Sequence, residues 1–278
     1  MWKTKICMSV LDDVDIDEVQ QVKLLKKCGF DGFACMYLGR EKTAELRAAA
    51  DECGMIFKYI HAQFGNVYKL WEGDSEQAGE VINELKECID ACRDFGVPIM
   101  VCHVIIGFER HSPNENGIKN FTQVVEYAEK NGVKIAFENT EGEEYLAAVM
   151  EAFKDKENVG FCWDTGHQLC YNHGESMTAL YGDRLMETHL NDNLGISDFE
   201  GSIRFTDDLH MLPFDGIANW NEIASELKRC NFTDTINFEL NQMNRPGRLE
   251  NTVYKEMPIE IYLTEAYKRA CRVAALMG

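Results

Sequence analysis

Apolar residues follow two alternating patterns along the chain. Short apolar runs, which are typical of buried strands, occur at Thr4–Leu11, Gly32–Leu38, Ile56–His61, Ile99–Ile106, Lys134–Asn139, Val159–Asp164, Leu185–Asn191 and Thr235–Leu240. Apolar residues at helical spacing predict helices at Ile16–Cys28, Thr43–Cys53, Ser75–Phe95, Asn116–Lys130, Glu144–Lys154, Ser176–Tyr181, Asn219–Cys230 and Ile259–Met277. The segments Ala62–Gly73 and Asp192–Gly216 show neither pattern and are expected to be loops.

This alternation predicts an α/β fold. Strands that alternate with helices pair in parallel, and eight such units in 278 residues fit a single closed (β/α)8 TIM barrel. An open doubly wound sheet is the competing arrangement, but the first strand–helix turn lacks the glycine-rich phosphate-binding fingerprint of many such sheets. Only 5 prolines and no long polar linker occur, so residues 1–278 are expected to form one domain.

Several predicted strands end in a carboxylate or an imidazole. A carboxylate such as Glu138, at the end of a buried run, needs a partner that offsets the cost of its burial. The carboxyl ends of barrel strands meet at one rim. Nine residues are therefore expected to share that rim: His61, His103, Glu138, Asp164, His167, His189, Asp208, His210 and Glu239.

Each of these residues has a structural explanation when taken alone. A strand histidine is usually a satisfied core residue, Glu138 or Glu239 could be half of an ion pair, and Asp208 or His210 could cap a turn. The complete set is stronger evidence for a metal site than any one of its residues, because clustered carboxylates repel one another unless a cation neutralises them. Five of the seven histidines belong to it. We therefore expect a metal site.

The donor types indicate which ions the site would take. Glu138, Asp164, His189 and Glu239 together offer three carboxylates and one imidazole. Such a set suits Mn²⁺, Mg²⁺, Co²⁺ or Fe²⁺ and tolerates Zn²⁺, and we expect Mn²⁺ first. Further histidines would favour zinc and more than one ion; the additional candidates are His61, His103, His167, Asp208 and His210.

Composition narrows the classes of partner. The chain has 47 acidic and 28 basic residues, a net charge of −19, which argues against a broad surface for nucleic acid. Its 11 cysteines are scattered without a CxxC pair, as expected for a protein of the reducing cytoplasm. We find no signal-peptide core and no apolar run long enough to cross a bilayer, so no membrane partner is expected.

The chain resembles the xylose isomerase-like TIM-barrel superfamily, which joins sugar and sugar-phosphate isomerases and epimerases with the endonuclease IV family. The resemblance covers nearly the whole chain and rests on FEN at Glu138, WDTGH at Asp164 and His167, HLND at His189, DLHMLPFDG at Asp208 and His210, and NFEL at Glu239.

The resemblance to the isomerases and epimerases implies a metal-dependent enzyme of carbohydrate metabolism. One divalent ion would be held by Glu138, Asp164, His189 and Glu239, and the two glutamates would move a proton at the carbon beside the substrate carbonyl. His167 would bind a substrate oxygen, and His61 and His103 are expected beside it as substrate-binding residues. Such enzymes commonly place an arginine shortly after the position of His189; it is missing here, and Arg204 is expected to replace it.

The endonuclease IV resemblance implies a different activity. All nine positions would hold three zinc ions that activate a water for attack on a phosphodiester. Phe64, Tyr68 and Trp71 would then contact DNA, whereas in a sugar enzyme they would form a hydrophobic lid. The expected mouth loops argue for the sugar, because Ala62–Gly73 contains only Lys69, and Asp192–Gly216 only Arg204, as basic residues.

A third interpretation is a non-catalytic barrel that binds a sugar or a metal. The paired Glu138 and Glu239 argue against it, because binding alone needs no base on each face of a carbon. The sequence therefore predicts a sugar or sugar-phosphate isomerase or epimerase with a small carbohydrate substrate, and a homo-oligomer is expected because barrel surfaces commonly pair with copies of themselves.

Overall fold

The predicted strands pair in parallel around a barrel. The computed structural model describes residues 3–108 and 112–278. Within these ranges the strands are β1 (Lys5–Ser9), β2 (Gly32–Met36), β3 (Ile56–His61), β4 (Ile99–Cys102), β5 (Lys134–Glu138), β6 (Val159–Asp164), β7 (Leu185–His189) and β8 (Thr235–Phe238). Parallel pairing joins them in the order β7-β6-β5-β4-β3-β2-β1-β8.

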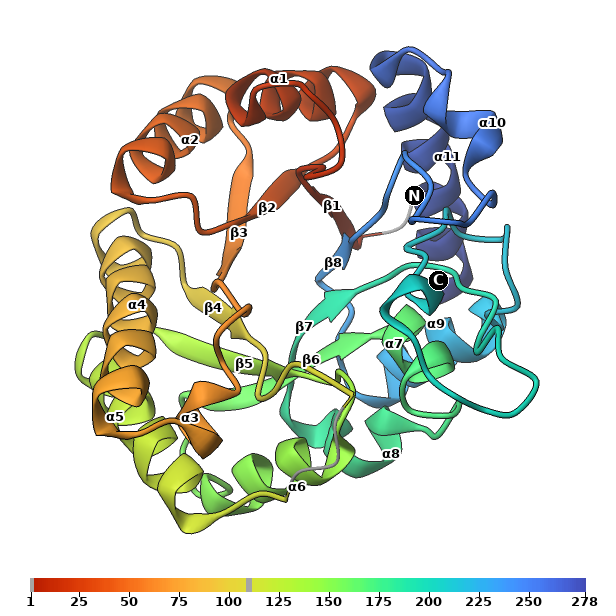
Figure 1. Cartoon of the computed structure of the whole chain (residues 1–278). Helices are drawn as coiled ribbons and strands as arrows, with labels where there is room; N and C mark the ends of the chain where they lie inside the picture. Colours follow the sequence, from red (N-terminus) through yellow and green to blue (C-terminus); the bar gives the residue numbers. More distant parts are fainter. Residues whose placement is uncertain (1–2, 109–111) are drawn as a thin grey trace.

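The barrel closes between β7 and β8. Leu190, directly after β7, forms a parallel bridge with Phe238. The Leu190 N–H donates to the Asn237 carbonyl over 2.9 Å, and the Leu190 carbonyl accepts from the Glu239 N–H over 3.3 Å. The strands surround the centre and the helices form an outer ring (Figure 1). The predicted (β/α)8 TIM barrel is therefore confirmed, and the open sheet is wrong.

Helices follow the strands around the outside. In the described part of the chain they are α1 (Glu18–Cys28), α2 (Arg40–Cys53), α3 (Lys69–Glu72), α4 (Ser75–Asp94), α5 (Glu115–Lys130), α6 (Glu143–Ala152), α7 (Thr165–Cys170), α8 (Met177–Tyr181), α9 (Trp220–Arg229), α10 (Thr252–Lys255) and α11 (Ile259–Met277). Three of them, α3, α7 and α10, lie where no helix was expected. They have 4, 6 and 4 residues, which is too short for a helical period to repeat.

Local side chains set the ends of the longer helices. The Asp17 carboxylate accepts hydrogen bonds from the Val19 and Gln20 N–H groups and so begins α1. Gly29 ends that helix with φ of 112°, a conformation that residues with a Cβ rarely adopt. Asp74 and Gln77 form a reciprocal capping box at the start of α4.

Strand residues alternate between the barrel interior and the helix-covered outside. In β5, Phe137 packs in the core between sheet and helices, with its ring 5.6 Å from that of Phe121 in α5. Ala136 belongs to a smaller apolar cluster contributed by strands alone. Because successive strand side chains point to opposite faces, Glu138 lies on the same face as Ala136. The strand that packs Phe137 against the outer helices therefore also places the Glu138 carboxylate inside the barrel, at its rim.

The structure also bears on the expectations about membrane-spanning helices and about the cysteines. No helix in residues 3–108 and 112–278 combines the length and the apolar character needed to cross a membrane. The 11 cysteines are all free.

Candidate metal centre and cavity

The carboxyl ends of the strands bring the candidate residues to one rim. His61, Glu138 and His189 are the last residues of β3, β5 and β7. Asp164 ends β6 in the same way, and His103 and Glu239 directly follow β4 and β8. His167 lies in α7, and Asp208 and His210 in the connection after β7. This common rim follows from parallel pairing, in which all strands end on the same side.

Four of these side chains converge most closely. The donor atoms of Glu138, Asp164, His189 and Glu239 all lie within 4.8 Å of one another. His189 is central: its Nδ1 is 3.0 Å from Glu138 Oε1, 3.0 Å from Glu239 Oε2 and 3.9 Å from Asp164 Oδ2. This central group is the set that the sequence pointed to as metal ligands, and three carboxylates with one imidazole fit a divalent cation.

The charge state of the central group supports a cation site. Burial alone raises the pKa of Glu138, but the imidazoles of His189 and His103 hold it well below its ordinary value. For Glu239, burial is likewise outweighed by His189, and the pKa falls to about 2. Burial raises the pKa of Asp164 to about 6. Both glutamates are therefore anionic at neutral pH, which is the state in which a carboxylate binds a metal ion.

Two flanking groups extend the centre on either side. On one side, His61 Nε2 and His103 Nε2 lie 3.1 Å and 3.2 Å from Glu138 Oε2. On the other side, Asp208 lies 2.8 Å from His210 Nε2 and 3.6 Å from His167 Nε2. The donor atoms within each flanking group also lie within 4.8 Å of one another. The structure thus arranges the nine predicted residues as three adjacent groups, with Glu138 shared by two of them.

Asp164 is fixed by residues that the sequence reasoning missed. Its Oδ1 accepts from the His167 N–H over 2.7 Å and so begins α7. The Asn191 side-chain amide donates to both Asp164 oxygens over 3.2 Å and 3.0 Å, and the Asn139 amide bonds the Asp164 backbone on both sides. The signal was present in the FEN and HLND runs, where each asparagine stands one or two residues after a candidate ligand.

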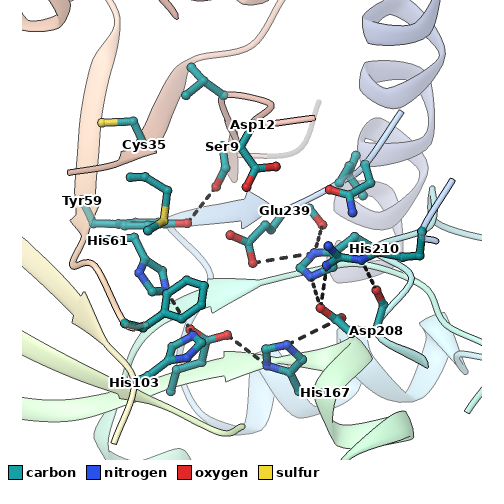
Figure 2. Close-up of a pocket in the computed structure, with 17 residues that line it drawn as sticks. Ser9, Asp12, Cys35, Tyr59, His61, His103, His167, Asp208, His210 and Glu239 are labelled. Carbon is teal, nitrogen blue, oxygen red and sulfur yellow. Dashed lines mark hydrogen bonds and ion pairs between the residues drawn. The ribbon is translucent and has the colours of Figure 1, made fainter. Parts of the chain in front are cut away.

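A cavity of about 140 Å³ opens above the centre. Seven of the nine residues line it, whereas Asp164 and His189 are fully buried behind them. Figure 2 shows side chains from opposite sides of the barrel pointing into this space. The lining is completed by Ser9, Val10, Asp12, Cys35, Met36, Tyr59, Phe64, Leu240, Asn241 and Arg245.

The expected arginine does not reach the cavity. Arg204 has a side chain that is 62% exposed and pairs with Asp198 over 3.0 Å, and it is not among the lining residues. Arg245 lines the cavity in its place and donates to Asp208 Oδ2 over 2.8 Å. Sequence reasoning could not choose between them, because both stand in irregular connections whose path no periodicity predicts.

The aromatic residues after His61 divide into different roles. Phe64 lines the cavity and stacks on His103 with ring centroids 4.3 Å apart. Trp71 is buried, donates its indole N–H to the Val104 carbonyl over 2.7 Å, and does not line the cavity. The expected lid or DNA contact is therefore wrong for Trp71, which is a core residue.

The fold and the rim together define a TIM barrel with a His/Asp/Glu centre at its carboxyl end. The chain belongs to the xylose isomerase-like TIM-barrel family, whose sequence model matches residues 22–257. This confirms the resemblance inferred from the motifs.

Two curated relatives are similar over part of the chain. The uncharacterized protein y4fM of Sinorhizobium fredii is 32% identical over 62% of this chain and 56% of its own length. The inosose isomerase of Bacillus velezensis is 25% identical over 60% of this chain and 62% of its own length. The chain thus matches less than two thirds of either relative.

Solved structures share the whole fold. A D-psicose 3-epimerase from Clostridium cellulolyticum H10, determined with D-tagatose, has a TM-score of 0.72 at 15% identity and covers 98% of this chain and 99% of its own. The IolI protein with a bound zinc atom has a TM-score of 0.75 at 20% identity and covers 98% of both chains. At these identities the likeness shows the fold alone.

Proposed function

We propose that the chain is a divalent-metal-dependent isomerase or epimerase of sugars or sugar phosphates that acts by proton transfer beside a carbonyl. The observation that carries this proposal is the pair Glu138 and Glu239. Both carboxylates line the cavity, and each lies 3.0 Å from the same nitrogen of His189. The similarity to an inosose isomerase and the shared fold of a D-psicose 3-epimerase support the same class of reaction.

Glu138, Asp164, His189 and Glu239 would hold the metal. Mn²⁺ is the first choice for an oxygen-rich set, and Zn²⁺, Co²⁺ or Mg²⁺ are the alternatives; the bound zinc atom of the IolI protein supports a divalent ion at a barrel of this kind. When bound, such an ion polarises the carbonyl and hydroxyl oxygens of the sugar and lowers the energy of the negative charge that develops there.

The protein side chains would supply the proton chemistry. One glutamate removes the proton from the carbon beside the carbonyl. The other, after it has taken up a proton from solvent, returns that proton to the opposite face or to the neighbouring carbon. Both glutamates are anionic at neutral pH, so either can accept. We assign the binding of substrate oxygens to His61, His103 and His167, which line the cavity, and we no longer assign Arg204.

Substitution of either glutamate tests the proposal. Glu138→Gln and Glu239→Gln are each expected to slow exchange of the substrate α-proton by about 100-fold or more, because a general base is lost. The measurement is deuterium incorporation in D₂O, followed by NMR with a panel of ketoses and inososes and added Mn²⁺. Circular dichroism should show a folded protein in both cases.

The control is Glu144→Gln, which changes an exposed glutamate of α6. It should exchange at the wild-type rate. Undiminished exchange in both active-site variants would remove the glutamates from the mechanism.

One observation favours a second candidate, an endonuclease IV-like hydrolase. The nine residues form three adjacent groups that could each hold an ion. Against it, Arg245 is the only Lys or Arg among the described residues that line the cavity, and the chain carries a net charge of −19. An incision assay on an abasic duplex, with metal content measured on the same sample, decides between them. Specific cleavage together with three zinc ions per chain would reverse the ranking.

We also propose one domain over residues 1–278, a cytoplasmic location and a homo-oligomeric state. Free thiols at all 11 cysteines support a reducing compartment. Exposed apolar side chains such as Phe199 and Phe205 support association with a second copy. Light scattering coupled to size-exclusion chromatography tests the oligomer.

A further inference from the structure

A second cavity lies between the barrel wall and its outer helices, apart from the metal centre. We call it the outer cavity; its volume is about 260 Å³. Its walls come from the end of β6 and from α7, α8 and the start of α9, which lie on the same side of the barrel (Figure 1). No described residue lines both this cavity and the one above the metal centre. The outer cavity is therefore a separate place for a ligand.

The inner wall of the outer cavity is apolar. Trp163 and Ile223 are buried, with 1% and 7% of their surfaces exposed, and Leu169 is partly buried. The one polar atom of the Trp163 side chain, its indole nitrogen, already donates to Gln168 Oε1 over 2.9 Å. The ring thus offers apolar surface to an occupant, which favours an aromatic or hydrocarbon group.

The outer wall carries two carboxylates that differ in their partners. Glu226 accepts from the Thr178 hydroxyl over 2.6 Å and pairs with Arg229, so its charge is already compensated. Glu222, one turn earlier on α9, is exposed and forms no hydrogen bond or ion pair through its carboxylate with the described residues. No lysine or arginine is among the described residues of the lining. The free charge of the outer cavity is therefore negative.

We infer that the outer cavity binds a small organic amine, with its apolar body against Trp163 and Ile223 and its ammonium group at the Glu222 carboxylate. Ile223 directly follows Glu222 on α9, so the apolar and the charged parts of the wall are adjacent. An ammonium donates charge-assisted hydrogen bonds to a carboxylate, whereas an organic anion would be repelled by it. The inference depends neither on the proposed function nor on a bound metal.

NMR titration of the whole chain with four matched probes tests the inference. Benzylamine has both an aromatic ring and an ammonium group, benzyl alcohol and benzoate replace the ammonium by an uncharged and an anionic group, and methylamine lacks the ring. The chain has 4 tryptophans, so few indole N–H signals are present, and Trp163→Phe assigns the relevant one. Benzylamine should shift the Trp163 signal and leave that of Trp71, which lines neither cavity, in place.

The expected affinities follow from the two walls. At low salt, benzylamine should bind about threefold or more tightly than benzyl alcohol, which is the scale of one exposed charge pair. Benzoate should bind more weakly than the alcohol, and methylamine should leave the Trp163 signal unshifted because it has no apolar body.

Two substitutions of Glu222 separate its charge from the shape of the cavity. Glu222→Gln keeps the size of the side chain, so benzylamine and benzyl alcohol should bind equally well. Glu222→Arg reverses the charge, so benzoate should bind more tightly than benzylamine. Because Glu222 is exposed, both variants should remain folded, which circular dichroism checks.

Glu175→Gln is the matched control. Glu175 is an exposed residue of the connection between α7 and α8 that does not line the outer cavity, and its substitution should leave the preference for benzylamine unchanged. The inference is overturned if benzylamine does not shift the Trp163 signal, if benzyl alcohol, benzoate or methylamine binds as tightly as benzylamine, or if Glu222→Gln keeps the wild-type preference.

Discussion

Gly166 shows how little room surrounds the candidate ligands at the scale of single residues. A Cβ at this position would lie 1.9 Å from the Asn191 Oδ1 atom. Asn191 in turn donates to both carboxylate oxygens of Asp164. A glycine is therefore required here so that the asparagine can hold the carboxylate in place.

Replacing this glycine should weaken metal binding without removing a ligand. In Gly166→Ala the added methyl group displaces the Asn191 amide, and loss of such a supporting hydrogen bond typically lowers metal affinity by about 10–100-fold. Competition with a fluorescent chelator measures the affinity for Mn²⁺.

Gly79→Ala is the matched control. Gly79 lies within α4 with nothing within 4 Å of its added Cβ. This change should raise the free energy of unfolding by about 0.5–1 kcal/mol and leave metal affinity unchanged. Equal affinity in Gly166→Ala and wild type would contradict the role given to Asn191.

The candidate ligands could be predicted from the sequence because each depends on a strand end. The position of Glu138 follows from the apolar run before it, and the same holds for Asp164 and His189. Arg245 could not be found in this way, since its side chain reaches the site from an irregular segment. Arg204 was chosen by its distance along the chain, and its exposed pairing with Asp198 shows that this distance does not measure position in space.

At the scale of elements, a partly buried contact joins α8 to α9. Thr178 of α8 donates its hydroxyl to the Glu226 carboxylate of α9 over 2.6 Å. Arg229, one turn further along α9, also pairs with this carboxylate and holds the pKa of Glu226 below its ordinary value. The anionic form is thus favoured in the folded protein.

This contact predicts a pH-dependent effect of Glu226→Gln. Because the folded-state pKa is lowered, the stability from this group is present above the unfolded-state pKa and is lost as the pH falls through the folded-state value. At pH 7 the substitution should lower the free energy of unfolding by about 0.5–1 kcal/mol, and near pH 3 the difference from wild type should shrink. Urea unfolding at both values measures it.

Glu126→Gln is the control for this series. Glu126 is exposed on α5, and the substitution should have little effect at either pH. A loss of stability in Glu226→Gln that is equally large at both pH values would show that packing, and not charge, links the two helices.

Most elements could be predicted from their periodicity. The helices that were not expected, α3, α7 and α10, are all too short for the helical period to repeat. The helix α4 has 20 residues and repeats its apolar face several times, whereas α7 has 6 residues. The start of α7 depends on Asp164, which sequence reasoning had assigned to the metal centre. A residue with two functions is hard to recognise from sequence, because one of the functions already explains why the residue is there.

At the scale of the whole molecule, the metal centre spans the closure of the barrel. Its four central residues come from the ends of β5, β6, β7 and β8. The contact between β7 and β8 depends on Leu190, through a bridge outside the named strands. A bound ion would therefore join strands on both sides of the closure between β7 and β8.

Removal of the ion should destabilise the folded chain. At a free Mn²⁺ concentration about 100 times Kd, binding to the folded state adds about 2.7 kcal/mol to the free energy of unfolding, so chelation with EDTA should lower Tm by several degrees. Differential scanning calorimetry with and without Mn²⁺ measures the change, and Glu138→Gln should show a smaller one. The same Tm with EDTA and with Mn²⁺ would argue against an ion held by all four strands.

Asp164 ties the start of a helix to the chemistry of the rim, since one oxygen begins α7 and the other faces His189. Asparagine is as good a residue as aspartate at the start of a helix, whereas alanine there costs about 1 kcal/mol. A descendant that abandons catalysis through Asp164→Asn can therefore keep its fold, while one that does so through alanine loses stability as well. Inactive barrels of this lineage should carry asparagine at this position, because Asp164→Asn removes the activity and leaves the fold stable.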